Sequence, residues 1–155
     1  MDGYSKAGFK VGDVVTVKDL LYGVILPSGA DACNAIAYHI AKDMDSFIEM
    51  MNQKAIDLKL NNTHFDNPIG KDSKNNYSNA KDLSNLLKYA LKNPIFKEIF
   101  CTKYYKINNL DLNLKSTLIG YSKKYDINTD FISGSKTGFT SGAGYCLASI
   151  ATIND

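Results

Sequence analysis

The sequence has 155 residues, a length that fits one domain or part of a larger one. Its 18 basic residues, all lysines, and its 16 acidic residues give a net charge of +2, which argues against a nucleic-acid-binding surface. Hydrophobic residues make up 45% and charged residues 22%, which excludes intrinsic disorder. No apolar run approaches the roughly 18 residues of a membrane-spanning helix, so the sequence predicts no transmembrane segment.

The cysteines and histidines do not form a metal-binding pattern. Cys33, Cys101 and Cys146 are far apart and include no C-x-x-C pair, and His39 and His64 do not have zinc-ligand spacing. The sequence therefore predicts no metal site. A disulfide framework is not expected either, because a chain of this length can build a core without one.

The first half of the chain predicts a helical layer. Residues 1–13 are expected to form a loop or an edge strand, and Thr16 begins a capping-box pattern whose helix cannot continue beyond Pro27. A second helix is predicted from Asp31 to Lys42, with Asp31 as its cap. Asp45 is expected to cap a third, whose apolar face is formed by Phe47, Met51, Ala55 and Leu58.

The middle of the chain combines a long polar connection with two further helices. Residues 61–79 are rich in Asn, and a connection of this length needs a function or internal packing of its own. Ser78 is predicted to cap a helix whose apolar residues run from Leu83 to Leu91. Pro94 suits the first turn of a short helix that follows.

The last third of the chain is rich in β-forming residues. Strands are predicted over residues 104–107, 110–114, 131–133 and 145–150, and the last two enclose a glycine-rich turn typical of a hairpin. Helices followed by strands predict an α+β protein. So few strands make a poor sheet alone, and we expect another segment or another molecule to complete it.

The segment around Lys136 is the strongest candidate for a functional site. Lys136, Thr137 and Gly138 place an ammonium and a hydroxyl beside a residue without a side chain, so an extended peptide could approach the strand edge while its carboxylate is held. The alternative is a solvated hairpin on which the lysine protects an edge strand from pairing. The triplet alone does not decide between them.

Four segments together resemble D-alanyl-D-alanine carboxypeptidases, the low-molecular-mass penicillin-binding proteins. Penicillin-recognising enzymes share the motifs S-x-x-K, S-D-N and K-T-G. Residues 20–32, LLYGVILPSGADA, resemble the family's second motif, which here begins at Ser28, and residues 134–147, GSKTGFTSGAGYCL, resemble the third. Residues 61–70, NNTHFDNPIG, and residues 80–100, AKDLSNLLKYALKNPIFKEIF, resemble the loop and helix between them.

The resemblance implies a fold, a reaction and a set of site residues. The expected fold is β-lactamase/transpeptidase-like, and the expected reaction removes the terminal D-Ala from a peptidoglycan stem pentapeptide through an acyl-enzyme, without metal or organic cofactor. Ser28 would be catalytic and pass a proton to the leaving amine. Lys136 and Thr137 would bind the terminal carboxylate, Gly138 would leave room for the substrate, and the backbone N–H of Phe139 would stabilise the oxyanion. β-Lactams would acylate the intact enzyme.

The sequence departs from the family pattern in two places. Ala30 stands where the second motif usually has Asn, which removes one expected hydrogen bond to the substrate. The nucleophilic Ser-x-x-Lys is expected well before Ser28, and only 27 residues precede Ser28. Two formal matches, residues 78–81 and 133–136, are not expected to act, because the first follows the second motif and the second lies on a strand, where residues three apart do not share a face.

We therefore expect residues 1–155 to be a partial carboxypeptidase catalytic domain, truncated at both ends, without the nucleophile-bearing part and the last strand and helix, and inactive alone. Two alternatives stay open. One is a non-catalytic module that binds peptidoglycan peptides, and the other is a helical domain whose incomplete sheet is covered by a partner or a second copy. The resemblance places the protein in the cell envelope, outside the cytoplasmic membrane, although residues 1–6 show no signal peptide.

Overall fold

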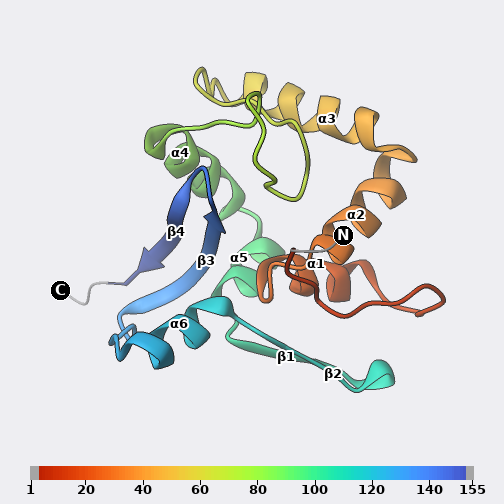
Figure 1. The fold of residues 1–155 in the computed structure, drawn as a ribbon, viewed down its shortest axis with the longest axis vertical. Helices are drawn as coiled ribbons and strands as arrows, with labels where there is room; N and C mark the ends of the chain where they lie inside the picture. The colour runs from red at the N-terminus through yellow and green to blue at the C-terminus, as the bar shows by residue number, and fades with distance from the viewer. Residues whose placement is uncertain (1–3, 153–155) are drawn as a thin grey trace.

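The fold combines a layer of helices with a β-hairpin, as Figure 1 shows in a computed structural model that describes residues 4–152. The elements are α1 (Val17–Ile25), α2 (Ala30–Ala41), α3 (Met44–Asp57), α4 (Ala80–Ala90), α5 (Pro94–Cys101), β1 (Tyr104–Ile107), η1 (Asn108–Leu110), β2 (Leu112–Lys115), α6 (Thr117–Tyr125), β3 (Ile132–Thr140) and β4 (Gly144–Ala151). The strands form two separate antiparallel pairs, β1–β2 and β3–β4. Within the described residues no helix is long and apolar enough to cross a membrane.

Local capping signals decide where the helices begin. The Thr16 hydroxyl accepts from the Asp19 N–H at 3.1 Å and the Asp19 carboxylate accepts from the Thr16 N–H at 2.9 Å, so the predicted capping box is confirmed. Pro94 is in the first turn of α5, as predicted, and directly follows the N-cap residue Asn93.

The predicted caps of α3 and α4 were wrong by one or two residues. Asp43, not Asp45, caps α3 by accepting from the backbone N–H of Ser46 at 2.8 Å. Asn79, not Ser78, caps α4. Asp, Asn and Ser cap almost equally well, so tertiary contacts choose between near neighbours of these types.

The helical layer packs around the C-terminal half of α1. Leu26 and Ile99 are the largest fully buried side chains, and the ring of Tyr22 stacks on that of Tyr105 with centroids 3.6 Å apart. The Tyr22 hydroxyl donates to the Glu98 carboxylate at 2.8 Å, which links α1 to α5. These contacts hold the end of α1, and with it the turn that leads into α2.

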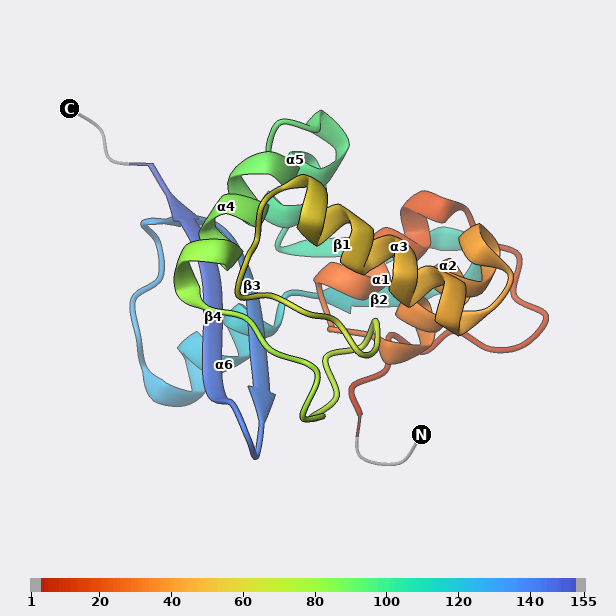
Figure 2. The same cartoon turned by 90° about the horizontal axis from the view of Figure 1, so that it is seen from above.

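The connection of residues 61–79 has an internal packing scheme. The Asn52 side chain exchanges two hydrogen bonds of 2.8 Å with the backbone of Phe65, and the buried Asp82 carboxylate accepts from the Asn62 N–H at 2.8 Å. The Asn67 side chain closes a turn with the backbone of Lys71. Figure 2 shows this loop running between the β3–β4 hairpin and α2, so it forms a wall beside β3.

The hairpin was predicted, whereas the helix before it was not. β3 and β4 pair in the register Lys136 opposite Ala148 and Phe139 opposite Tyr145. Gly134 lets β3 approach α5, because a Cβ there would be 2.8 Å from the ring of Phe100. Helix α6 packs against β3. It was not predicted because the helix is short and has Gly120, a poor helix former, in its middle.

Candidate active site

Ser28 lies in the turn between α1 and α2, in a backbone conformation that few non-glycine residues adopt. Its φ is 60°, in the left-handed region, which costs about 1–2 kcal/mol for an L-residue. The next residue must be glycine, because a Cβ on Gly29 would be 2.7 Å from the Cβ of Ala7 and 2.7 Å from a carboxylate oxygen of Asp31. The turn is thus held in a strained shape by close packing on both sides.

Asp31 stabilises this turn, but not as the helix cap that the sequence predicted. Gly29 is the N-cap of α2, and the Asp31 carboxylate instead accepts from the backbone N–H groups of Ala7, Gly8 and Phe9 at 2.8, 2.8 and 3.0 Å. Burial raises the pKa of Asp31, but these backbone hydrogen bonds outweigh it and the pKa lies below its ordinary value. Asp31 therefore binds the N-terminal segment to the start of α2.

Lys136 reaches across from β3 to the Ser28 turn. Its Nζ donates to the Ser28 Oγ and to the carbonyl oxygen of Thr137. Burial lowers the pKa of Lys136 below its ordinary value. Burial also raises the pKa of the neighbouring Cys33 thiol to about 11, although the Lys136 charge opposes the rise, so this thiol is protonated at neutral pH.

The residues after Lys136 form an accessible strand edge. The Thr137 hydroxyl is hydrogen-bonded to the hydroxyl of Thr117, the first residue of α6, at 2.5 Å. Gly138 is exposed, and a Cβ there would meet only the Cβ of Cys146, at 3.7 Å. Phe139 is 56% exposed. A ligand can therefore approach the backbone at Gly138 closely.

One cavity of about 860 Å³ brings together the site residues expected from the sequence. Ser28, Lys136, Thr137, Gly138 and Phe139 all line it, although Ser28 and Lys136 are 108 residues apart. Further lining residues carried no sequence signal for a site, because only tertiary packing brings them here: Cys33, Asp72, Thr117 and Tyr121. Within residues 4–152 no group of three or more His, Cys, Asp or Glu side chains could hold a metal ion.

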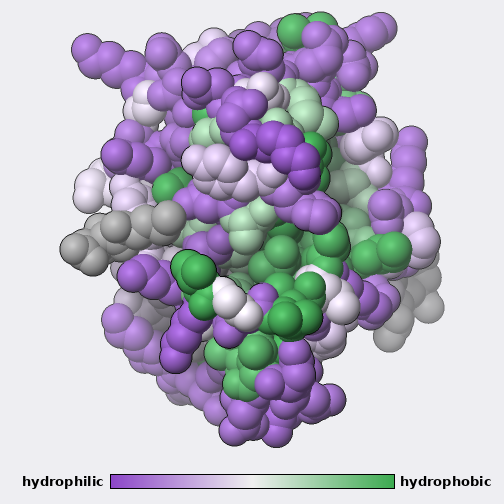
Figure 3. All heavy atoms as spheres, turned by 90° about the vertical axis from the view of Figure 1, so that its right-hand side faces the viewer, coloured by the Kyte–Doolittle hydropathy of each residue, from purple (hydrophilic) through white to green (hydrophobic). Residues whose placement is uncertain are grey.

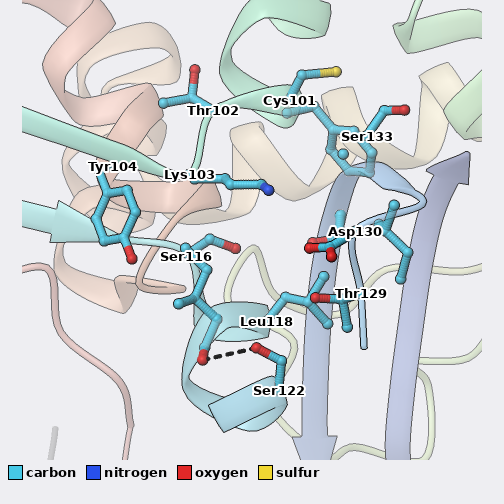
Figure 4. A pocket seen from close by; sticks show the side chains of 15 residues that line it. Cys101, Thr102, Lys103, Tyr104, Ser116, Leu118, Ser122, Thr129, Asp130 and Ser133 are labelled. Carbon is cyan, nitrogen blue, oxygen red and sulfur yellow. Dashed lines mark hydrogen bonds between the residues drawn. The ribbon is translucent and has the colours of Figure 1, made fainter. Parts of the chain in front are cut away.

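A smaller cavity of about 320 Å³ lies between the end of α5, α6 and the start of β3. Figure 4 shows the side chains of Lys103 and Asp130 pointing into it from opposite sides. Neither Ser28 nor Lys136 lines this space. It therefore lacks the pairing of a hydroxyl with a buried ammonium that distinguishes the larger cavity.

The two formal Ser-x-x-Lys matches do not place a serine against its lysine. The Ser133 hydroxyl pairs with the hydroxyl of Thr152 at 3.0 Å, whereas Lys136 contacts Ser28. The Ser78 hydroxyl pairs with that of Thr63 at 2.8 Å. Neither arrangement lets the lysine of the match take the serine proton.

The overall structure is similar to those of penicillin-binding DD-peptidases. The Streptomyces K15 DD-transpeptidase superposes with a TM-score of 0.83 at 36% identity, and the match covers 98% of this chain and 62% of the transpeptidase. Penicillin-binding protein 5 from Haemophilus influenzae gives a TM-score of 0.83 at 34% identity, over 98% of this chain and 43% of its own. The predicted β-lactamase/transpeptidase-like α+β fold is confirmed.

The chain belongs to peptidase family S11, D-alanyl-D-alanine carboxypeptidase, whose family model matches residues 1–155. It is 38% identical to the D-alanyl-D-alanine carboxypeptidase of Streptomyces sp. (strain K15), over 96% of this chain and 54% of the relative. It is 39% identical to DacC of Escherichia coli (strain K12), over 99% of this chain and 37% of the relative. The chain thus spans between about a third and a half of these relatives' length.

Proposed function

We propose that this chain supplies the carboxylate-binding side and the proton-relay serine of a serine-type D-Ala-D-Ala carboxypeptidase. The substrate is a peptidoglycan stem pentapeptide, and the reaction removes its terminal D-Ala. The observation that carries the proposal is the contact between the Lys136 ammonium and the Ser28 hydroxyl, made by two motifs 108 residues apart in a chain of this family. Such a substrate places the protein at the cell wall, outside the cytoplasmic membrane.

Substrate binding begins at the partly buried ammonium of Lys136. The terminal carboxylate of the peptide lies against Lys136 and Thr137, where a charge-assisted hydrogen bond is strengthened because Lys136 is partly buried. The open face of Gly138 lets the peptide backbone lie along β3. This arrangement fixes the scissile bond beside the Ser28 hydroxyl.

Ser28 then acts on the leaving group. As the nucleophile's oxygen forms an ester with the penultimate residue and the peptide C–N bond breaks, the leaving amine of D-Ala takes a proton from the Ser28 hydroxyl, which is hydrogen-bonded to Lys136. The proton that the nucleophile's hydroxyl loses restores the Ser28 hydroxyl, so Ser28 relays one proton and is unchanged at the end of the step. The backbone N–H of Phe139 stabilises the negative oxygen of the tetrahedral intermediate. Water afterwards hydrolyses the ester and frees the shortened peptide.

We expect the nucleophile to come from outside these 155 residues. We expect the isolated chain to bind the peptide terminus and to form no acyl-enzyme, because neither Ser-x-x-Lys match pairs its own serine and lysine. Labelling with a fluorescent penicillin tests this, with full-length DacC from E. coli as the labelled control. A covalent penicillin adduct on the isolated chain would contradict the expectation.

The buried Ala30 favours a second candidate, a binding module that recognises D-Ala-D-Ala without cleaving it. Ala30 is 4% exposed and its N–H donates to the Ser5 carbonyl at 2.9 Å, so this position contributes no side-chain amide to a substrate. The two candidates differ in turnover. The test adds to this chain the Ser-x-x-Lys segment of a relative. If the chain is part of a carboxypeptidase, D-Ala should be released from the peptide. If it is a binding module, the peptide should bind and no D-Ala should be released.

A further inference from the structure

The smaller cavity, of about 320 Å³, has opposite charges on its two sides. Lys103, just before β1, and Asp130, in the loop between α6 and β3, both line it, and their side chains point into it from opposite sides (Figure 4). Within the described residues neither side chain belongs to an ion pair. A cation and an anion therefore face this space without a charged partner of their own.

Two buried serines line the same cavity, and their hydroxyl groups lack a hydrogen-bond partner within residues 4–152. Ser116 is 8% exposed and Ser135 is 7% exposed. No fully enclosed side-chain oxygen in this part of the chain is without a partner, so both hydroxyls must be open to the cavity. Figure 4 shows the Ser116 hydroxyl directed into it. Since buried polar groups are almost always hydrogen-bonded, the contents of the cavity must supply these bonds.

Ser116 lies on the Lys103 side of the cavity, at the start of α6. Its backbone N–H donates to the Lys103 carbonyl at 2.9 Å, which places the two residues side by side. Ser116 is the N-cap of α6, but its side chain makes no capping hydrogen bond. The first turn of a helix carries N–H groups and the positive end of the helix dipole, which attract an anion. Lys103, Ser116 and the start of α6 together therefore suit a carboxylate.

The opposite side of the cavity suits an ammonium group. Figure 4 shows the Thr129 hydroxyl directed into the cavity on the same side as the Asp130 carboxylate. Leu118 and Ile132 also line the cavity and give it an apolar part. Asp130 would repel a simple anion and Lys103 would repel a simple cation. A ligand that carries both charges satisfies both sides.

We propose that this cavity binds a small apolar amino acid, such as alanine, in its zwitterionic form. Its carboxylate lies against Lys103 and Ser116, its ammonium against Asp130, and its side chain against the apolar part. The volume is at the lower end of the roughly 300–1,000 Å³ of small-molecule sites, so the ligand must be small. Neither Ser28 nor Lys136 lines this cavity, and the inference does not depend on the proposed function.

The test titrates the isotopically labelled 155-residue protein with L-alanine and with D-alanine and follows the backbone amides by NMR. Propionate, which lacks the ammonium, and ethylamine, which lacks the carboxylate, are the matched ligands. We expect saturable shifts of the amides of residues 116–119 and 133–135 with at least one enantiomer, at millimolar concentrations. Propionate and ethylamine should each bind at least about tenfold more weakly, because each leaves one charge unpaired.

Two charge variants assign the binding to this cavity. Lys103→Gln and Asp130→Asn should each weaken alanine binding at least about tenfold, and Asp130→Asn should bind propionate more tightly than the wild-type protein does. Lys123→Gln and Asp126→Asn remove the same charges at exposed positions that do not line the cavity, and should leave alanine binding unchanged. Circular dichroism verifies that the variants are folded.

Ser116→Ala separates ligand binding from a structural role of this serine. Because the hydroxyl has no hydrogen-bond partner within the described residues, its removal should leave the urea midpoint unchanged. Alanine binding should become about threefold weaker, since the carboxylate loses one hydrogen bond. A lowered midpoint with unchanged alanine binding would show that Ser116 acts on the fold and not on a ligand.

Three results would overturn the proposal. They are the absence of saturable shifts with either enantiomer, equal affinity for alanine and its two analogues, and alanine binding that survives in both charge variants. Shifts confined to the amides around Ser28 and Lys136 would place alanine in the large cavity and would also contradict it. None of these results bears on peptide binding at Lys136, so the proposed function is tested separately.

Discussion

The two sides of the large cavity are built in opposite ways. At the Ser28 turn, Gly29 is buried and an added Cβ would be within 2.8 Å of three neighbouring atoms, whereas Gly138 on β3 is exposed with one neighbour at 3.7 Å. The serine side is fixed by packing and the strand side is open. Figure 3, which views the molecule from the α2 side of Figure 1, shows apolar residues gathered across the middle of the face, with hydrophilic residues above and below. The difference separates positions that hold the site from positions that admit a ligand.

The largest expected effect comes from filling the packed side. Gly29→Ala should lower the free energy of unfolding by about 2–3 kcal/mol, because the new Cβ must displace Ala7 and Asp31. Gly120→Ala is the matched control. An added Cβ meets nothing within 4 Å there, in the middle of α6, and should stabilise the protein by about 0.5–1 kcal/mol. Urea denaturation measures the free energy of unfolding of both variants. Equal changes in the two variants would contradict the claim that Gly29 is fixed by close packing.

Removing the carboxylate that holds the Ser28 turn should have the next largest effect on stability. Asp31→Ala loses three hydrogen bonds to backbone N–H groups and should cost about 2 kcal/mol at pH 7. Asp45→Ala, at an exposed position in the first turn of α3, should cost less than about 0.5 kcal/mol.

The Asp31 effect should also depend on pH. Since the folded protein lowers the pKa of Asp31 from its ordinary 3.8, the stabilisation is complete above that value and is lost as the pH falls through the lowered pKa. The difference in the free energy of unfolding between the wild-type protein and Asp31→Ala should become smaller below pH 3.8. A difference that grows on acidification would be inconsistent with the contacts described.

Filling the open side should affect binding and leave stability almost unchanged. Gly138→Val should change the free energy of unfolding by less than about 0.5 kcal/mol, because its side chain has open space. It should weaken binding of a D-Ala-D-Ala tripeptide at least about tenfold, since the peptide backbone needs that space. Calorimetry and urea denaturation on the same variant test this, and tight peptide binding would exclude β3 as the docking edge.

The smallest expected effect concerns the strained backbone of Ser28. Ser28→Gly relieves a left-handed conformation, with φ of 60°, but increases the conformational entropy of the unfolded chain. The free energy of unfolding should therefore rise by at most about 1 kcal/mol. Peptide binding should fall at the same time, because the hydroxyl that contacts Lys136 is lost. A loss of stability would show that the conformation is not strained.

The sequence predicted the elements better than the site. Thr16 with Asp19 and Pro94 are local signals that act within a few residues, so the starts of α1 and α5 followed from them. Helix α6 was missed because Gly120 and its mixed polarity carry no clear periodicity.

The site depended on contacts that local patterns cannot express. The resemblance to the family predicted that Ser28 and Lys136 belong to one site, but no spacing rule predicts that residues 108 positions apart meet. The role of Asp31 was misjudged because its partners, Ala7 to Phe9, lie more than twenty residues earlier in the chain. Asp72 and Thr117 reach the cavity only through the folded loop and through α6.

The most direct test of the account is the pKa of Lys136, measured by NMR titration of the isotopically labelled protein with and without a D-Ala-D-Ala tripeptide. Burial should place this pKa below its ordinary 10.5 in the free protein, and peptide affinity should fall as the pH rises through the lowered value. A bound carboxylate favours the charged ammonium, so the pKa should rise when the tripeptide is added. An ordinary pKa that the peptide leaves unchanged would contradict the claim that Lys136 is a buried carboxylate-binding group.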